Sequence, residues 1–250
     1  MTNDIRQEVD NIAKKYFDSS SSLFATIAFY NTSISYTHKN KDADMLEAYD
    51  HLRDELLKTH HGDVTDLMKE VMLKHMPSLC LSSLVSAFEE FLTESMSMAL
   101  VHHPLKITNK NVDFKLLFEL SKEEIIDLKV KEHINQIMYK APRDYLKSLC
   151  DILSIDEKII SEEFNKYIEV KARRDLGVHN GWRINDIYIE KVKATGADIT
   201  SEKVLKPDVS YCIDAFGICM KLVKSITNSV CSNLYKIPVI FANTADQPEK

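Results

Sequence analysis

Glycine is scarce in this chain: five of its 250 residues are glycine and six are proline. Sheet-rich folds turn the chain repeatedly through tight loops that depend on these two residues. The glycines also lack the spacing of the GxGxxG and GxxxxGKS/T loops that hold phosphate groups. Their scarcity therefore predicts an all-α protein and excludes Rossmann and P-loop nucleotide sites.

Charge and cysteine content narrow the class of protein further. Thirty-two basic and 38 acidic side chains give a formal net charge of −6, which excludes a globally basic nucleic-acid surface. The five cysteines lie mostly in apolar stretches and predict reduced, buried thiols in a cytoplasmic protein. The chain has no apolar signal-peptide core at its amino terminus, and its apolar runs fall far short of the ~20 residues that span a bilayer. We therefore expect a cytoplasmic protein with no membrane contact.

Hydrophobic periodicity predicts helices separated by polar breaks in the first part of the chain. Apolar residues at helical spacing indicate a helix over residues 3–18. A polar break is expected at Ser19–Ser22, followed by an apolar segment over residues 23–30 and a loop over residues 31–44. Two further helices are predicted, over residues 44–58 and 64–76.

The remainder of the chain predicts a compact helical domain. Its expected helices cover residues 78–102, 121–139, 142–153, 154–176 and a last segment that begins at Pro207. Ser121 with Glu124 and Ser154 with Glu157 have capping-box spacing, and Gly177 and Gly181 are expected to end the fourth of these helices. Residues 105–120 and 182–206 are predicted to be irregular connections. The division we predict is a helical extension at 1–76, a helical domain at 77–236 and a tail at 237–250.

Chemistry-bearing side chains are concentrated at the end of one predicted helix. Two arginines, an aspartate, a histidine and an asparagine occur between Arg173 and Asn180. From Lys171 to Lys193, basic residues outnumber acidic ones although the whole chain is acidic. A guanidinium holds a phosphate through two hydrogen bonds, and an imidazole titrates near neutral pH and moves protons. This combination is typical of phosphodiester chemistry.

This stretch resembles the signature of the HEPN superfamily, which is an arginine, a polar residue, a short spacer and a histidine. Arg174, Asp175, the Leu-Gly-Val run and His179 match that pattern in order, and Asn180-Gly181 follow it. The flanking segments look like the other core helices of such domains: LVSAFEEFLTESM, SKEEIIDLKVKEHINQIM, PRDYLKSLCDIL and KPDVSYCIDAFGICMKLVKSI. The resemblance covers residues 77–236.

The resemblance implies an all-α homodimer in which two such motifs share one cleft and cut RNA without a metal or cofactor. His179 would be the general acid or base for attack by the ribose 2′-hydroxyl, and Arg174 would stabilise charge on the phosphorane. Attack by this hydroxyl restricts the reaction to RNA. The supporting candidates are Asp175, Asn180, Arg173 and Glu89. Such enzymes commonly act in toxin–antitoxin or antiviral defence systems under the control of an antitoxin or another partner protein.

Two features of the motif leave alternatives open. On an ideal helix His179 lies ~140° around the axis from Arg174, so we expect Gly177 to release the chain from the helix or a second subunit to complete the cleft. Asp175 stands where the family often has asparagine, and its carboxylate is able to pair with Arg174 in place of a phosphate. The alternatives are a non-catalytic module that dimerises and binds a nucleotide, RNA or a protein, and a scaffold in which Arg174 and His179 cap a helix.

Other polar residues have simpler interpretations. The pairs His60-His61 and His102-His103 follow predicted helices and lack the spacing of a zinc site, so we expect no metal. Glu89 belongs either to a solvated helix face or to a cleft where it would set the pKa of His179. Trp182 is either a platform for an RNA base or a packing anchor.

Overall fold

The computed structural model describes residues 2–40, 75–108, 111–193, 195 and 203–241. Most of these residues are helical, and β pairing among them is limited to an isolated bridge between Arg183 and Val204. The prediction of an all-α fold is therefore confirmed. No helix within the described ranges is long and apolar enough to cross a membrane.

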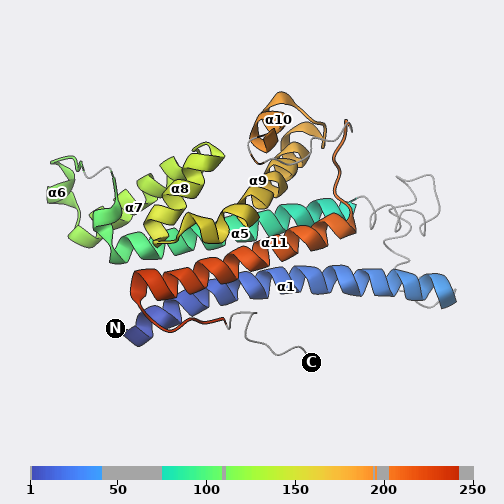
Figure 1. The fold of residues 1–250 in the computed structure, drawn as a ribbon, viewed down its shortest axis with the longest axis horizontal. Coiled ribbons are helices and arrows are strands. Elements are labelled where there is room, and N and C mark those ends of the chain that lie inside the picture. Colours follow the sequence, from blue (N-terminus) through green and yellow to red (C-terminus); the bar gives the residue numbers. More distant parts are fainter. Residues whose placement is uncertain (1, 41–74, 109–110, 194, 196–202, 242–250) are drawn as a thin grey trace.

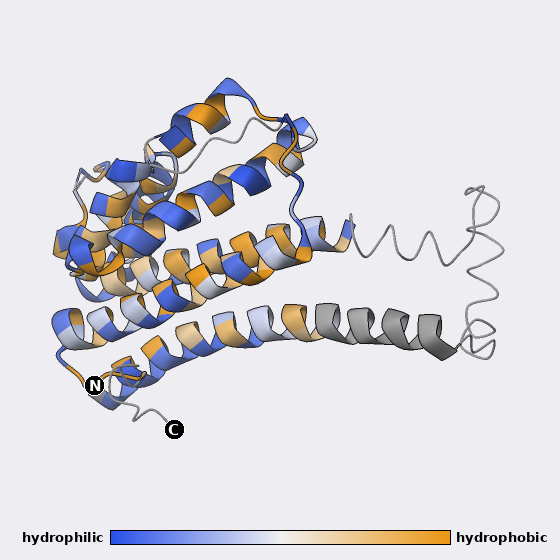
Figure 2. Cartoon of the chain, turned by 45° about the vertical axis from the view of Figure 1, so that its right-hand side comes forward, coloured by the Kyte–Doolittle hydropathy of each residue, from blue (hydrophilic) through white to orange (hydrophobic). Residues whose placement is uncertain are grey.

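Three long helices form one layer of the molecule. They are α1 (Thr2–Asn40), α5 (Met76–His102) and α11 (Val209–Ser229), and Figure 1 and Figure 2 both show them running side by side. A π-helical segment, Val230–Tyr235, continues α11. The buried face of α5 is wide because this helix contacts α1, α11 and the second layer together.

A second layer of helices packs over α5. They are α7 (Lys122–Met138), α8 (Pro142–Leu153) and α9 (Glu157–Asn180), with α10 (Asp186–Lys193) packed on α9. Two short pieces, Pro104–Lys106 and α6 (Leu116–Glu119), lie in the segment predicted to be an irregular connection. Figure 1 shows α8 and α10 on the same side of α9.

Aromatic rings at the centre of the core fix α9 against α5 and α1. Phe88 and Tyr167 meet edge to face with ring centroids 4.5 Å apart, and Tyr16 of α1 lies 6.0 Å from Phe88. Arg174 follows Tyr167 by two helical turns, so it projects from the same face of α9. The packing of Tyr167 therefore directs Arg174 toward α5.

The polar break predicted at Ser19–Ser22 is wrong, because α1 continues through it to Asn40. The hydroxyl of Ser20 donates to the carbonyl of Tyr16 over 2.7 Å and is buried, so this serine needs no partner outside the helix. The loop predicted over residues 31–44 is likewise helical up to Asn40. The helices predicted over 44–58 and 64–76 lie outside the described residues, apart from the last two positions of the second.

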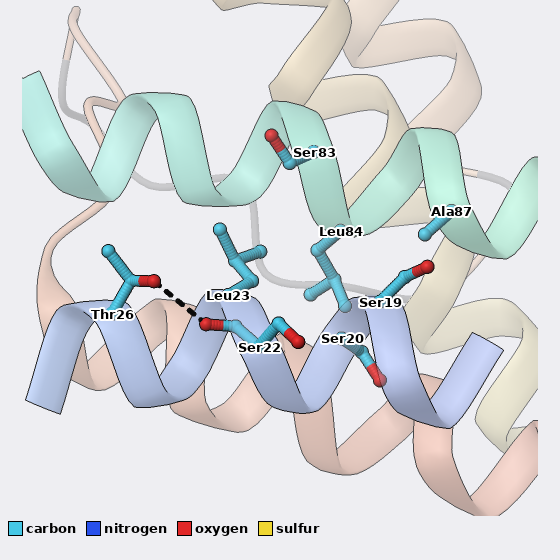
Figure 3. A pocket seen from close by; sticks show the side chains of 8 residues that line it. All are labelled: Ser19, Ser20, Ser22, Leu23, Thr26, Ser83, Leu84 and Ala87. Atoms are coloured by element: carbon cyan, nitrogen blue, oxygen red, sulfur yellow. Dashed lines mark hydrogen bonds between the residues drawn. The ribbon is translucent and has the colours of Figure 1, made fainter. Parts of the chain in front are cut away.

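The serine-rich stretch of α1 has a packing role. Small side chains there face Ser83 and Ala87 of α5 across a cavity of about 270 Å³, which Figure 3 shows from close by. Val9, Ala13 and Tyr16 are buried in the same core as α5 and α11. The division of the chain at residue 76 stays a prediction, but the described part of α1 shares its core with the residues after it.

One of the two predicted capping boxes is confirmed and the other is wrong. The capping box of Ser121 and Glu124 is present, with both hydrogen bonds formed. The box predicted at Ser154 is wrong, because Ser154 ends α8 with a φ of 57° and Asp156 caps α9 instead. The hydroxyl of Ser154 accepts a hydrogen bond from Lys106 over 2.7 Å, and this bond attaches Lys106 to the end of α8.

The region between α9 and α11 also differs from its prediction. Residues 182–206 were expected to be irregular, but Asp186–Lys193 form α10, and Asn185 accepts a hydrogen bond from the backbone of Tyr188 at its start. The last helix begins at Val209 rather than Pro207, because Asp208 caps it through the amide of Tyr211.

The cysteines and the tail complete the core. All five cysteines are buried with free thiols, so the predicted burial is confirmed. In the tail, Ile237 is buried and the side chain of Asn228 forms two hydrogen bonds with the backbone of Phe241. The tail therefore remains attached to α11 as far as the structure describes it.

Candidate functional site

The residues of the Arg/His motif lie on one uninterrupted helix. The expectation that Gly177 ends this helix is wrong: α9 passes through Gly177 and ends at Gly181, which has a φ of 56°. Gly177 is required for a different reason, since a β-carbon there would lie 2.3 Å from the ring of Trp182. Trp182 turns back on the helix with a φ of 67° and packs on this bare backbone. The indole is therefore a packing anchor.

Arg174 is held between two carboxylates. Its Nη2 donates to Oε2 of Glu89 over 2.8 Å, and its Nε lies 3.2 Å from Oδ1 of Asp175. The Arg174 side chain is 18% exposed, so it is reachable from solvent at one edge. Glu89 and Asp175 position the guanidinium and also neutralise it.

Lysines extend this pairing on both sides. Lys171 donates to the second oxygen of Glu89, and Lys191 lies 3.2 Å from the second oxygen of Asp175. The five side chains form one row, which we call the charge row: Lys171, Glu89, Arg174, Asp175 and Lys191. Three cations and two anions leave it with a formal charge of +1.

His179 is not part of the charge row. It is exposed on the last turn of α9, and because the helix is continuous it lies ~140° around the axis from Arg174. Glu89 contacts Arg174 and Lys171, so the structure places it beside the arginine of the motif and not beside the histidine. One chain alone does not bring Arg174 and His179 onto a common face.

The other two candidates on α9 hold the local structure together. Asn180 donates its side-chain amide to the carbonyl of Arg183 over 2.6 Å, which fixes the turn after the helix. Arg173 pairs with Glu169 over 2.8 Å and lies 3.9 Å above the ring of Tyr211. These contacts turn Arg173 toward α11, away from the charge row.

Glu169 joins three helices and was not singled out from the sequence. Besides Arg173, it accepts hydrogen bonds from the hydroxyls of Tyr188 on α10 (2.9 Å) and Tyr211 on α11 (2.5 Å). Burial, followed by the charge of Glu169, raises the pKa of both tyrosines, so both remain donors. The spacing of Glu169 and Arg173 is the one sequence signal for this cluster.

A pocket of about 320 Å³ opens beside the charge row, between the start of α8, the middle of α9 and the end of α10. Its walls include Tyr145, Phe164 and Tyr167, and three lysines line it: Lys140, Lys171 and Lys191. Tyr167 is 1% exposed, and its hydroxyl has no hydrogen-bond partner among the described residues. No sequence pattern predicts this pocket, because it needs α10, which lies in the segment expected to be irregular.

The histidine pairs do not form a metal site in the described part of the chain. His102 bonds with the hydroxyl of Tyr235 over 3.1 Å and lies 3.5 Å from Glu8, while His60 and His61 lie outside the described residues. Among the residues that the structure describes, no three His, Cys, Asp or Glu side chains are grouped to hold a metal ion.

Comparisons with protein-family models, with curated proteins and with solved structures give no match to this chain. The motif on α9 and the geometry around it are therefore the basis for inferring function.

Proposed function

We propose that this protein is a HEPN-like, metal-independent endoribonuclease whose site is completed by a second copy of the chain. The observation that supports the proposal is the end of α9. There an arginine positioned by Glu89 and Asp175 precedes an exposed histidine by five residues. The charge row has a formal charge of +1 within a chain whose net charge is −6, which favours phosphate binding at this place.

The chemistry assigns separate roles to the two residues. His179 takes the proton of a ribose 2′-hydroxyl, whose oxygen attacks the adjacent phosphorus. The 5′-oxygen leaves and receives a proton from a second imidazole, which the His179 of the partner copy supplies. Arg174 stabilises the charge that gathers on the phosphorane oxygens. The products are a 2′,3′-cyclic phosphate and a 5′-hydroxyl.

A dimer accounts for the angle between Arg174 and His179. The two residues diverge on one helix, so a substrate that touches both needs a surface contributed by another chain. In this proposal the protein acts in the cytoplasm as a toxin or defence effector, and an antitoxin or other partner protein restrains it. Asp175 and Asn180 orient the reacting groups, and Glu89 positions Arg174.

Cleavage of mixed cellular RNA in excess chelator tests the proposal. The purified protein is compared with His179→Ala, Arg174→Ala and a control, Arg143→Ala, which removes an exposed arginine on α8. We expect the wild type and the control to leave cyclic-phosphate ends, and the two motif variants to lose at least ~100-fold in rate, since general acid–base catalysis contributes about 10²–10⁴-fold. Cleavage that persists in His179→Ala, or that requires a metal, contradicts the proposal.

A non-catalytic RNA-binding module is the second candidate. It is favoured by the pairing of Arg174 with two carboxylates, because a phosphate must displace one of them to reach the guanidinium. Three results together would replace the first function by this second one. The wild type binds RNA, the Arg174→Ala variant binds it more weakly, and neither protein cuts it. Sedimentation of the same samples decides whether the chain is a dimer.

A further inference from the structure

We propose that the pocket between α8, α9 and α10 binds a small organic anion in which one flat aromatic ring carries a phosphate or carboxylate group. This pocket shares Lys171, Asp175 and Lys191 with the charge row, but it lies within one chain and neither Arg174 nor His179 lines it.

The walls of the pocket suit a single ring. Tyr145 and Phe164 lie with centroids 5.7 Å apart and planes inclined by 34°, and Phe164 and Tyr167 are fully buried behind the opening. Met138, Pro142 and Ile168 complete the apolar lining. A volume of about 320 Å³ is at the lower end of ligand pockets, which start near 300 Å³. A ligand of one ring with its substituent fits this volume.

The charges around the pocket favour an anion. Lys140, Lys171 and Lys191 line it, and Asp175 is the one acidic residue among the described lining residues. Lys140 lies in the turn before α8, Lys171 on α9 and Lys191 on α10, so three separate parts of the chain contribute positive charge to the lining. Glu89 faces Lys171 from α5, and Asp175 faces Lys191. Lys140 bonds to the neutral hydroxyl of Ser148 and is therefore available to an incoming anion at low cost.

Tyr167 contributes to the wall of the pocket through its ring. Its hydroxyl is buried away from the pocket surface, and no group among the described residues bonds to it. The aromatic walls and the lysines therefore define the class of ligand.

Isothermal titration calorimetry with the full chain tests the proposal. The probes are phenyl phosphate and benzoate, and inorganic phosphate and phenol serve as the ring-free and charge-free comparisons. We expect one of the two aromatic anions to bind to one site per chain, at least ~10-fold tighter than either comparison. Which of them binds more tightly distinguishes a phosphate from a carboxylate ligand.

Matched variants locate the site. Lys140→Gln and Lys191→Gln each remove one positive charge from the lining of the pocket. Lys193→Gln removes an exposed lysine of helix α10, which also carries Lys191. Loss of one charge-assisted hydrogen bond predicts at least ~10-fold weaker binding for Lys191→Gln. Binding to Lys193→Gln is expected to equal binding to the wild type. Circular dichroism confirms that each variant is folded. The proposal is overturned if neither aromatic anion binds at millimolar concentration, if the comparisons bind equally well, or if Lys193→Gln weakens binding as much as Lys191→Gln.

Discussion

At the scale of single residues, Arg174 is both prepared and restrained by its neighbours. Glu89 and Asp175 hold its guanidinium in one orientation, which reduces the entropy lost when it binds a phosphate. The same carboxylates compete with that phosphate for the guanidinium. Asp175 is the more replaceable of the two, because its contact with Arg174 is longer (3.2 Å against 2.8 Å) and its side chain is more exposed.

The variant Asp175→Asn tests this competition. The amide keeps the shape of the side chain and removes its negative charge, so we expect RNA to bind up to ~5-fold more tightly, the range set by a partly exposed ion pair. Filter binding or fluorescence anisotropy with a short RNA measures the change. Asp186→Asn, at an exposed position on α10, is the charge-matched control. Equal effects in both variants would show a general gain of positive charge instead of a local one.

Gly177 is the second residue whose identity is constrained by its neighbours. A β-carbon at this position meets the Trp182 ring at 2.3–2.6 Å, and overpacking of this kind costs about 1–3 kcal/mol. In Gly217→Ala the new β-carbon meets nothing within 4 Å, and alanine favours the helix by about 1 kcal/mol. We therefore expect Gly177→Ala to lower the melting temperature and Gly217→Ala to raise it. Thermal unfolding followed by circular dichroism measures both, and a stabilised Gly177→Ala would contradict the packing of Trp182.

At the scale of elements, Glu169 connects α9 to α10 and α11. Its carboxylate receives three hydrogen bonds, from Arg173, Tyr188 and Tyr211. The orientation of α10 in turn places Lys191 beside Asp175 and closes the pocket. The geometry of the candidate site therefore depends on Glu169 and its three partners, although none of these four residues lines the pocket or belongs to the charge row.

Removal of this carboxylate is expected to destabilise the fold. Glu169→Ala removes the acceptor of the buried Tyr188 and of the partly buried Arg173 and Tyr211. Breaking a fully buried pair costs about 3 kcal/mol, and this sets the upper end of the loss we expect. The control is Glu162→Ala on the same helix, where a side chain that is 84% exposed pairs with Lys166 and where a change within about 0.5 kcal/mol is expected. Urea unfolding measures both variants. Equal stability of the two would show that Glu169 does not hold the three helices together.

At the scale of the whole molecule, one core collects all five thiols. Burial raises the pKa of Cys80 to about 11 and the pKa of Cys150, Cys212 and Cys219 to about 12, from an ordinary value of 9.0. Burial raises the pKa of Cys231 in the same direction. Below about pH 8 these thiols are protonated in the folded and the unfolded chain alike, so they make no pH-dependent contribution there.

Above pH 9 the unfolded chain loses thiol protons that the folded chain retains. The free energy of unfolding therefore falls between pH 9 and pH 12, by about 1 kcal/mol per thiol at pH 10. Buried tyrosines with raised pKa values act in the same direction at higher pH. Urea unfolding at pH 7.5 and pH 10 measures the loss, and Cys219→Ala should show a smaller one. Equal stability of the wild type at the two pH values would contradict the burial of the thiols.

The sequence by itself determined the features that depend on local interactions. Scarce glycine and proline predicted the helical class, apolar spacing predicted the helices after Pro77, and the capping box at Ser121 was recognised because its partners are three residues apart. The motif on α9 was found in the same way, since its residues are neighbours in sequence.

Only the tertiary structure decided the features whose partners are distant in sequence. Ser19–Ser22 predicted a break because serines favour helix ends in isolation, but packing against α5 and α11 outweighs that preference. Gly177 was predicted to end the helix, but α9 continues through it and the ring of Trp182 packs against its backbone. The partner of Arg174 is Glu89, which is 85 residues away, and the pocket needs three elements in contact. A local sequence pattern does not predict such contacts, because they form only when distant segments of the chain pack together.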